Sequence, residues 1–454
     1  MANRASTRFL AGVIEGFYGQ PWNQAERFEL LDRLAASGLN TYLYAPKDDL
    51  KHRALWREPY TPEELGQLTS LIARCQMSGL KFIYALGAGL DICYGEAAEI
   101  EKLQQRLAQL LAAGCEHFAL LFDDIPDRLS PEDHGRFGSF ALAQCHVANA
   151  VFRWVRERSP AARFLFCPTP YCGRMAERKL GGENYLETIG RELPPEIDVL
   201  WTGPEIISRE ITVEHVREMQ RVLRRKPLLW DNLHANDYDG RRFYCGPYAG
   251  RTPELRKEIA GVLLNPNCEL ALNFVPLRTF AEFVRGSAAW DARHAYLAAM
   301  AEWWPRFATG GQPVPLEDLV LLGDCYYLPF EEGAGAEVFF QRARALLATD
   351  PAEWGEAAGK FLAQSARLRE LCARLTELRD RPLFYALSRR IWELREELDL
   401  LERYVTARRE NKSSAAALRS DFHLPGTYRG GLVPRLQRLL APRADGSFMP
   451  PAAP

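Results

Sequence analysis

Residues 118–125 read FALLFDDI, an apolar run that ends in two adjacent aspartates. A short apolar run of this kind is typical of a strand that is buried on both faces, as in a parallel sheet. Amphipathic stretches that favour helices lie on either side of it, at 100–113 and 131–157. The stretch therefore predicts a helix–strand–helix unit of an α/β protein, with Asp123 and Asp124 at the carboxyl end of the strand.

The same alternation continues on both sides of this unit, through roughly the first 300 residues. Further strands are expected at Phe9–Ile14, Thr41–Tyr44, Lys81–Ala85, Phe164–Cys167, Asp198–Trp201, Pro227–Trp230 and Glu269–Asn273. Helices are expected between them, for example at Ala25–Ala36, Pro62–Met77 and Val213–Leu223. Eight strands with intervening helices fit a (β/α)8 TIM barrel. A dinucleotide-binding sheet is disfavoured, because no Gly-x-Gly-x-x-Gly motif follows the first strand.

The chain of 454 residues is too long for one hydrophobic core, since compact domains stop growing near ~250–300 residues. A Gly/Pro-rich linker is expected at 310–315, and helices are expected after it at 316–322, 338–347, 352–378 and 383–409. The sequence thus predicts a barrel at 1–308, an all-α helical domain at 309–440 and a disordered Pro/Ala-rich tail at 441–454.

Apolar residues in the last of these helices recur at alternating spacings of three and four, from Phe384 to Val405. This is the pattern of a helix that packs lengthwise against another helix. Packing within an antiparallel helix pair of one chain is the simpler explanation, and a dimer surface is the alternative.

Composition argues against several classes of protein. Lys and Arg number 57 against 59 Asp and Glu, and no basic block is present that would bind the phosphates of a nucleic acid. No apolar run reaches the ~18 residues of a membrane span. The ten cysteines are scattered and lie mostly in apolar runs, as buried thiols do, rather than in a disulfide or zinc pattern. With no secretory leader recognised, these features predict a reducing, cytoplasmic environment.

The active site of a TIM barrel lies at the carboxyl ends of its strands. The segments that follow the expected strands carry acids, amides, a lysine and aromatic side chains: Glu15–Trp22, Ala45–Asp49, Asp123, Asp124, Pro168–Tyr171, Trp230–Asp237 and Asn273. Such a mixture suits a sugar, because its C–H faces stack on aromatic rings and its hydroxyls need both donors and acceptors.

Spacing alone leaves three explanations for the adjacent Asp123 and Asp124. Two carboxylates at the end of an apolar strand are costly unless they are used or paired. In glycoside hydrolysis, one carboxyl group acts as a general acid while a second group stays anionic. Acids after a strand also bind Mg²⁺ in phosphoryl-transfer enzymes, and a purely structural pair is the third possibility.

Seven motifs, spread almost collinearly from about residue 9 to residue 280, carry a resemblance to one family. They read GVIEGFYGQPW, TYLYAPKDDLKHRALWREPY, FALLFDDI, FCPTPYC, LWTGPEI, LLWDNLHANDYD and NPNCELALNF. These motifs closely resemble the catalytic domain of glycoside hydrolase family 84, and within it the nucleocytoplasmic protein O-GlcNAcases. The resemblance implies a retaining exo-β-N-acetylglucosaminidase that needs no metal and no cofactor.

The family uses substrate-assisted catalysis, in which the nucleophile is the carbonyl oxygen of the substrate's own 2-acetamido group. By resemblance, Asp123 accepts the acetamido N–H and stabilises the positive charge of the forming oxazoline. Asp124 is the general acid that protonates the leaving oxygen and then the base that activates water. This division of roles requires that Asp124 be protonated and Asp123 charged near neutral pH.

The resemblance also implies which residues bind the sugar. Cys167, Tyr171 and Trp230 match residues that wall the acetamide pocket, with the Tyr171 hydroxyl donating to the acetamido oxygen or the oxazoline. The residues that match groups binding the 3-, 4- and 6-hydroxyls are Lys47, Asp237, Asn273 and the backbone of Gly16. Asn232 matches an amide near the catalytic carboxylate. His234 is interpreted as structural, and Asp48, Asp49 and Asp231 as ion-paired or supporting groups.

The substrate and the assembly stay open at this level. GlcNAc on Ser or Thr of proteins and free GlcNAc-containing glycans, such as chitin or cell-wall fragments, need the same acetamide pocket. A non-catalytic GlcNAc-binding protein is the alternative of another class, and the intact set of Asp123, Asp124, Tyr171 and Asn232 argues against it. O-GlcNAcases dimerise through helical stalks, so the resemblance implies a homodimer through the helical domain. Neither nucleic acid nor a membrane is expected as a partner.

Overall fold

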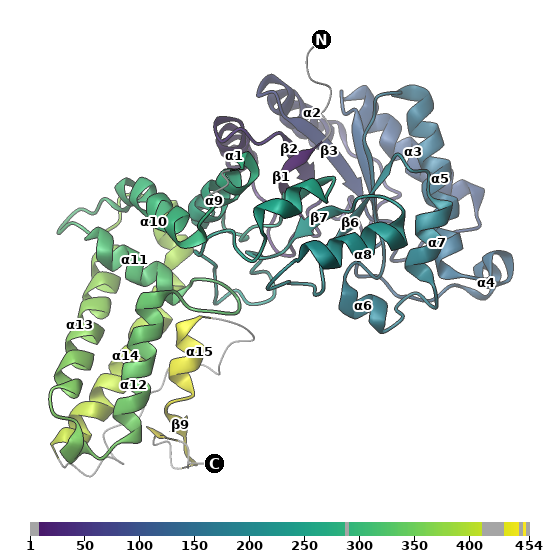
Figure 1. The fold of residues 1–454 in the computed structure, drawn as a ribbon. Helices are drawn as coiled ribbons and strands as arrows, with labels where there is room; N and C mark the ends of the chain where they lie inside the picture. The colour runs from purple at the N-terminus through teal and green to yellow at the C-terminus, as the bar shows by residue number, and fades with distance from the viewer. Residues whose placement is uncertain (1–8, 287–289, 411–430, 445–447, 451–454) are drawn as a thin grey trace. The chain divides into compact units, whose positions relative to one another are not determined.

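The structure is a computed structural model that describes residues 9–286, 290–410, 431–444 and 448–450 (Figure 1). Its first compact unit comprises the residues up to Asp237 together with Tyr248–Leu270 and Phe280–Trp290. The second unit comprises Tyr238–Pro247, Ala271–Thr279 and the residues from Asp291 onward. The two units are therefore interleaved along the chain, whereas the sequence suggested a single boundary after residue 308.

The first unit is a closed barrel in which strands β1 to β8 pair in sequence order. The strands are β1 (Leu10–Glu15), β2 (Thr41–Tyr44), β3 (Lys81–Leu86), β4 (His117–Leu121), β5 (Phe164–Cys167), β6 (Ile197–Trp201), β7 (Leu228–Asp231) and β8 (Gly261–Leu264). All neighbours are parallel, and β1 closes the barrel by pairing with both β2 and β8. The predicted fold class, a TIM barrel followed by an all-α helical region, is confirmed.

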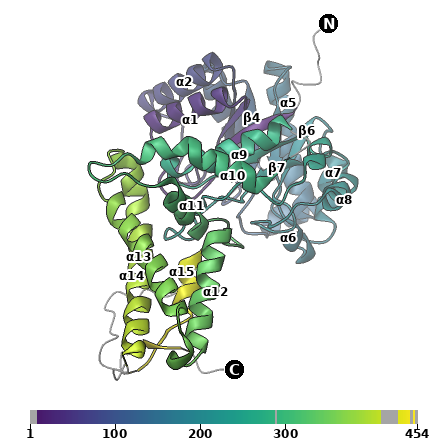
Figure 2. The same cartoon turned by 60° about the vertical axis from the view of Figure 1, so that its left-hand side comes forward.

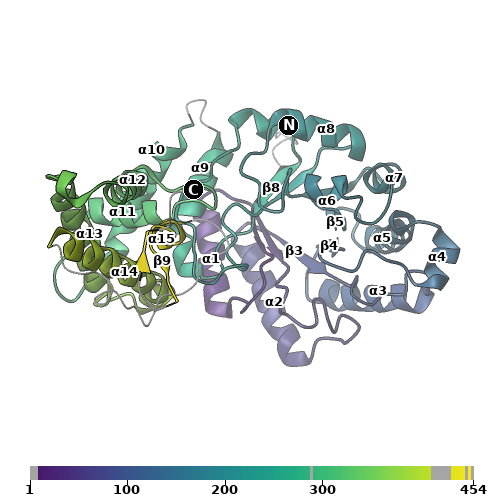
Figure 3. The same ribbon diagram turned by 90° about the horizontal axis from the view of Figure 1, so that it is seen from below.

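Helices connect the strands of the barrel. They are α1 (Gln24–Ala36), α2 (Pro62–Met77), α3 (Ala97–Ala112), α4 (Pro131–Phe137), α5 (Phe140–Arg158), α6 (Gly173–Glu177), α7 (Tyr185–Glu192) and α8 (Val213–Leu223). Figure 3 shows α2, α3, α5, α7 and α8 outside the strands. Local sequence explains where two of them begin, because Asn23 with Glu26 and Thr61 with Glu64 form capping boxes.

Two expectations about these elements are wrong. The last strand is Gly261–Leu264, and the expected strand at 269–273 instead contains the short 3-10 helix η2 (Leu270–Leu272). Only a glycine fits at position 261, where a Cβ would lie 2.2 Å from the Leu10 carbonyl oxygen. The expected helix at 131–157 is interrupted at Gly138, whose left-handed backbone (φ 69°) ends α4.

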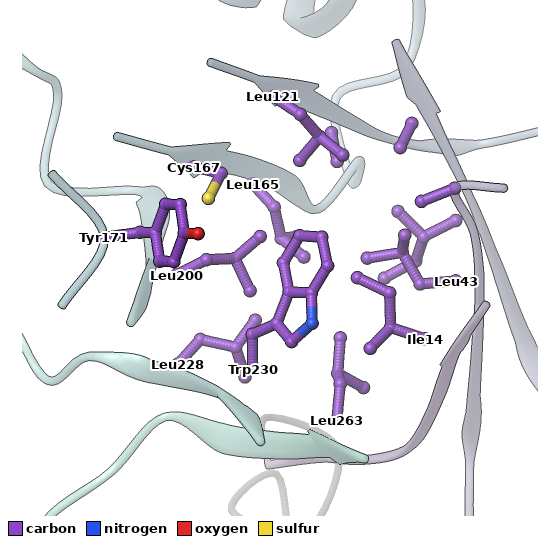
Figure 4. Close-up of a cluster of buried hydrophobic side chains, with 14 of the residues drawn as sticks. Ile14, Leu43, Leu121, Leu165, Cys167, Tyr171, Leu200, Leu228, Trp230 and Leu263 are labelled. Carbon is purple, nitrogen blue, oxygen red and sulfur yellow. The ribbon is translucent and has the colours of Figure 1, made fainter. Parts of the chain in front are cut away.

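The interior of the barrel is filled by every second residue of its strands. Successive side chains of a strand point to opposite faces, so inward positions recur with a period of two. The inward side chains labelled in Figure 4 include Ile14, Leu43, Leu121, Leu165, Leu200, Leu228, Trp230 and Leu263. Asp123 continues the inward parity of Leu121 past the end of β4. The same alternation that builds the core therefore directs the Asp123 carboxylate toward the end of the barrel at which the strands have their carboxyl ends.

The second unit contains a group of helices: α10 (Ala292–Trp303), α11 (Leu316–Cys325), α12 (Ala334–Ala348), α13 (Ala357–Leu375), α14 (Arg381–Arg409) and α15 (Leu432–Gln437). Figures 1 and 2 both show α13 and α14 side by side. Of the regularly spaced apolar residues of α14, here called the seam, Phe384 is half-buried, and Leu387, Ile391, Leu394, Leu398, Leu401 and Val405 are buried within one chain. This burial confirms the simpler explanation of the seam. Among the described residues, no helix is long and apolar enough to cross a membrane.

The segment after residue 440 was expected to be disordered. Within its described part, β9 (Ala441–Pro442) and β10 (Phe448–Met449) pair as antiparallel strands. Phe448 is buried, so an apolar contact orders this part of the segment. Residues 445–447 and 451–454 of the expected tail lie outside the described residues.

Candidate active site

Asp123 is a buried anion that lies two residues after the end of β4. Lys47 reaches it from the segment after β2, and the distance from its Nζ to Oδ2 of Asp123 is 2.5 Å. Burial raises the pKa of Asp123, but the charges of Lys47 and Arg53 outweigh that effect and bring the pKa below its usual value. Asp123 is therefore ionised at neutral pH.

Two polar atoms at this place are buried without a hydrogen-bond partner among the described residues. They are Oδ1 of Asp123 and the indole Nε1 of Trp230. Trp230 shares a buried cluster with Tyr171 and Cys167 (Figure 4), and Lys47 lies over its ring at 5.2 Å from the centroid. Buried polar groups normally have partners, so a free acceptor and a free donor indicate a place for a polar ligand.

Asp124 differs from its neighbour in both exposure and contacts. Its side chain is exposed, and its backbone takes the left-handed conformation (φ 51°), which is uncommon for a residue with a Cβ. The Tyr171 hydroxyl donates to Oδ1 at 2.7 Å, and the Tyr18 hydroxyl donates to Oδ2 at 3.0 Å. Burial first, and then the Asp124 charge, raise the pKa of both tyrosines, so both stay neutral donors.

Arg53 supports Asp124 from the segment that follows β2. One guanidinium nitrogen donates to the Tyr18 hydroxyl and another to the main-chain carbonyl of Asp124, both at 2.5 Å. Arg53 thus contacts both the backbone of Asp124 and one of its two hydroxyl partners. The sequence placed Tyr18 in a rim segment, Glu15–Trp22, but assigned a role to neither Tyr18 nor Arg53. Tyr18 lies in the loop after the first strand, but nothing within the charged run at 47–53 distinguishes Arg53.

The other predicted residues are placed as follows. A Cβ on Gly16 would lie 2.5 Å from Cζ2 of Trp230, so the bare glycine backbone packs on that ring. The carboxylate of Asp237 accepts the backbone N–H of Tyr18 at 2.9 Å. Asn232 donates to the Ile206 carbonyl and accepts from Asn265, both at 2.9 Å. Its amide is therefore held by neighbouring loops, and these two hydrogen bonds do not involve Asp123 or Asp124.

Asn273 is fully buried in the second unit, directly before α9 (Phe274–Arg285). Its assigned role in binding a sugar hydroxyl stays a prediction.

Three further acids near the strand ends have structural partners. Asp231 is fully buried and forms an ion pair with Arg251 at 2.7 Å. Asp48 accepts the backbone N–H of Gly19 at 2.6 Å, and Asp49 accepts the hydroxyls of two tyrosines, Tyr44 and Tyr60. Their interpretation as ion-paired or supporting groups is confirmed. Within the described ranges, no three His, Cys, Asp or Glu side chains are grouped so that they could hold a metal ion.

The closed barrel and a rim that holds two adjacent carboxylates in contrasting environments are features of one class of protein, the (β/α)8 glycoside hydrolases. Residues 11–309 match the family model described as beta-N-acetylglucosaminidase. The chain belongs to this family, glycoside hydrolase family 84, as the motifs of its sequence predicted.

Curated relatives and solved structures agree with this membership. The "Protein O-GlcNAcase" of Rattus norvegicus and that of Mus musculus are each 47% identical over 280 residues, which is 62% of this chain and 30% of the relative. The matched region thus spans less than a third of those relatives. A mutant of the Thermobaculum terrenum O-GlcNAc hydrolase is 29% identical, with a TM-score of 0.78 over 88% of this chain and 84% of that one. The structure titled CpGH84B, at 22% identity and a TM-score of 0.75 over 87% and 68% of the two chains, shows the fold alone.

Proposed function

We propose that this protein is a retaining exo-β-N-acetylglucosaminidase that removes O-linked GlcNAc from Ser and Thr of proteins or from small β-GlcNAc glycosides. The observation that carries the proposal is the contrast between the two adjacent acids. Asp123 is buried and charged, and one of its oxygens has no partner in the described part of the chain, whereas Asp124 is exposed and accepts two hydroxyl hydrogen bonds. An anion and a proton carrier at one site are what substrate-assisted hydrolysis requires.

Asp123 has the geometry to bind the acetamido group of the substrate. Its free Oδ1 accepts the acetamido N–H, while Lys47 holds Oδ2. The negative charge then stabilises the positive charge that develops on the oxazoline ring. Trp230 and Cys167 wall the acetamide pocket. Burial raises the pKa of the Cys167 thiol, so it lines the pocket as a neutral group.

Asp124 carries the proton in both halves of the reaction. In the first half, the acetamido oxygen attacks the anomeric carbon, the glycosidic bond breaks, and the Asp124 proton goes to the leaving oxygen. In the second half, Asp124 removes a proton from water, which attacks the same carbon and opens the oxazoline. Two displacements at one carbon give net retention. The hydroxyls of Tyr18 and Tyr171 stabilise the carboxylate that forms between the two steps.

Proton NMR of aryl β-GlcNAc hydrolysis tests the proposal. The first product should be the β-anomer, and a thiazoline analogue of the oxazoline should inhibit. The matched aryl β-glucoside, which lacks the acetamido group, should not be hydrolysed at a comparable rate. A first-formed α-anomer, or equal turnover of both glycosides, would contradict the mechanism. Binding of GlcNAc without any hydrolysis would instead support a non-catalytic sugar-binding protein.

Hydrolysis of free GlcNAc-containing glycans is the second candidate function, because it uses the same acetamide pocket. The curated relatives are named for protein O-GlcNAc, which supports the protein substrate. Comparing kcat/KM on an O-GlcNAc peptide and on chitobiose separates the two. A preference for chitobiose would assign the enzyme to glycans.

We expect Arg53→Gln to lower kcat about 10-fold with little change in KM, because it removes two hydrogen bonds that fix Asp124, whereas Lys47 still holds Asp123. Steady-state kinetics on an aryl β-GlcNAc substrate measures this. Arg53→Lys should restore part of the activity, and Arg57→Gln, on a neighbouring half-buried arginine that contacts neither Asp123 nor Asp124, is the matched control. An effect on KM alone would show that Arg53 serves binding rather than the position of Asp124.

We also propose a homodimer formed through the helical unit. Tyr385 and Trp392 lie seven residues apart on α14 and are 67% and 51% exposed, so one helix face carries two large aromatic groups. Light scattering at micromolar concentration should give the mass of a dimer, and a monomer mass would contradict this. A cytoplasmic location is likewise a proposal, and it is supported by ten free cysteines of which most are buried.

A further inference from the structure

A cavity of about 250 Å³ lies beside the loop that carries Asp123 and Asp124. The loops after β3 and β4 form its walls, with Gly89 and Ile92 on one side and Pro126, Arg128 and Leu129 on the other. Gly89 packs against Ile125, the residue that follows Asp124, since a Cβ on Gly89 would lie 2.6 Å from the Ile125 side chain. The two loops are therefore in direct contact just after Asp124.

The acids that line this cavity already have partners. The carboxylate of Asp91 accepts hydrogen bonds from Arg57 at 2.6 Å and from the indole of Trp56 at 2.8 Å. The carboxylate of Asp133 is buried and accepts the backbone N–H groups of residues 94 and 95. By contrast, the Arg128 side chain is exposed and makes no hydrogen bond or ion pair with any residue that the structure describes. Arg128 is thus the charged residue of the lining that has no partner among the described residues.

The lining does not suit a second sugar ring. Tyr94 is the aromatic residue of the wall, and it is 4% exposed because its ring packs against Phe122 and Phe140. The hydroxyl of Ser130 accepts the backbone N–H of Asp133. A sugar needs an open aromatic face and free hydrogen-bonding groups. The Arg128 guanidinium, beside the apolar side chains of Ile92, Pro126 and Leu129, fits instead a short aliphatic chain that ends in a carboxylate.

The chain length sets how far the cavity lies from the reacting bond. Arg128 lies four positions after Asp124, so their Cα atoms are at most ~14 Å apart. An extended peptide advances about 3.3–3.6 Å per residue. Arg128 therefore reaches positions within about four residues of a glycosylated Ser or Thr.

We propose that this cavity is a subsite for an acidic side chain of the peptide that carries GlcNAc, and that Arg128 determines this preference. The inference rests on the proposed function and adds to it a class of protein substrate. The enzyme should favour glycosylated sites with Glu or Asp nearby.

Seven-residue O-GlcNAc peptides with a single Glu, or Gln at the same place, test the subsite. The wild type should favour Glu about 5- to 10-fold in kcat/KM at one position, and less at high salt. Arg128→Gln should abolish this preference, Arg128→Glu should reverse it, and Arg128→Lys should keep part of it. Equal kcat/KM for Glu and Gln peptides in the wild type, or a preference that survives Arg128→Gln, would overturn the proposal.

Two further substrates separate this result from its alternatives. Turnover of a neutral aryl β-GlcNAc glycoside should be the same in all Arg128 variants, and its absence in the wild type would contradict the proposed function and the subsite with it. A GlcNAc disaccharide whose second sugar carries a lactyl carboxylate offers the same charge on a glycan. The cavity would be a glycan subsite, and the peptide proposal would fail, if Arg128 raised kcat/KM for that disaccharide above kcat/KM for chitobiose but did not raise kcat/KM for Glu peptides above that for Gln peptides.

Discussion

Asp124→Asn is expected to lower kcat on an O-GlcNAc peptide about 10²- to 10⁴-fold, the usual contribution of a positioned general acid. A serine alkoxide is a poor leaving group, so the glycosidic oxygen must be protonated as the bond breaks. A nitrophenolate leaves without protonation, so the loss on an aryl glycoside with such a group should be much smaller. Kinetics on a series of leaving groups of graded acidity measures the difference.

The shape of the pH profile gives a second readout for Asp124. Because Asp124 both donates and accepts the proton, the dependence of kcat on pH should differ in shape between the wild type and Asp124→Asn. Asp127→Asn, which changes an exposed acid of the same loop, is the matched control and should keep the wild-type profile. Full activity of Asp124→Asn on the peptide would remove Asp124 from its assigned role.

Asp123→Asn is expected to lower kcat by about 10²- to 10³-fold on every leaving group, because the lost group stabilises charge on the oxazoline rather than on the departing oxygen. The thiazoline inhibitor should bind more weakly by a similar factor. Steady-state kinetics and inhibitor titration measure both effects. A loss confined to poor leaving groups would instead identify Asp123 as the proton donor.

This substitution also leaves the Lys47 ammonium buried without its counter-charge, so folding must be checked separately. Breaking one side of a buried pair costs about 3–5 kcal/mol of unfolding free energy. The double variant Lys47→Met, Asp123→Asn removes both charges and should recover much of that stability while staying inactive. Because the pKa of Asp123 is lowered in the fold, the pair stabilises at neutral pH, and this contribution is lost on acidification through the folded-state pKa.

The first seven strands could be predicted from the sequence because short apolar runs separated by amphipathic stretches are a local signal. The last strand could not, because the apolar residues at 269–273 give the same signal as Gly261–Leu264. The choice depends on closure of the barrel, in which Gly261 meets the backbone of β1. The break at Gly138, by contrast, has a local cause that the expected continuous helix left out, since a glycine with left-handed backbone commonly ends a helix.

The candidate site shows the same division. Adjacent Asp123 and Asp124 stand out in the sequence because two acids close an apolar strand. The different environments of the two acids cannot be recognised in the sequence, since Lys47 lies 76 residues from Asp123 and Tyr18 lies 106 residues from Asp124. Arg53 could not be recognised for the same reason: its hydrogen bonds to the Tyr18 hydroxyl and the Asp124 carbonyl form only once the loops after β1, β2 and β4 meet at one rim.

The sequence by itself determined the family, the barrel and the pair of acids, because these depend on residue types at short spacing along the chain. The resemblance implied that Asp123 is the charged acid, but only the tertiary structure showed which groups keep it charged, which residues hold Asp124, and that Arg128 lines a cavity without a partner among the described residues. Burial, ion pairing and hydrogen bonding between distant segments arise when the barrel closes and its loops converge. Charge and solvation at a site are therefore properties of the fold, even where each residue can be recognised in the chain.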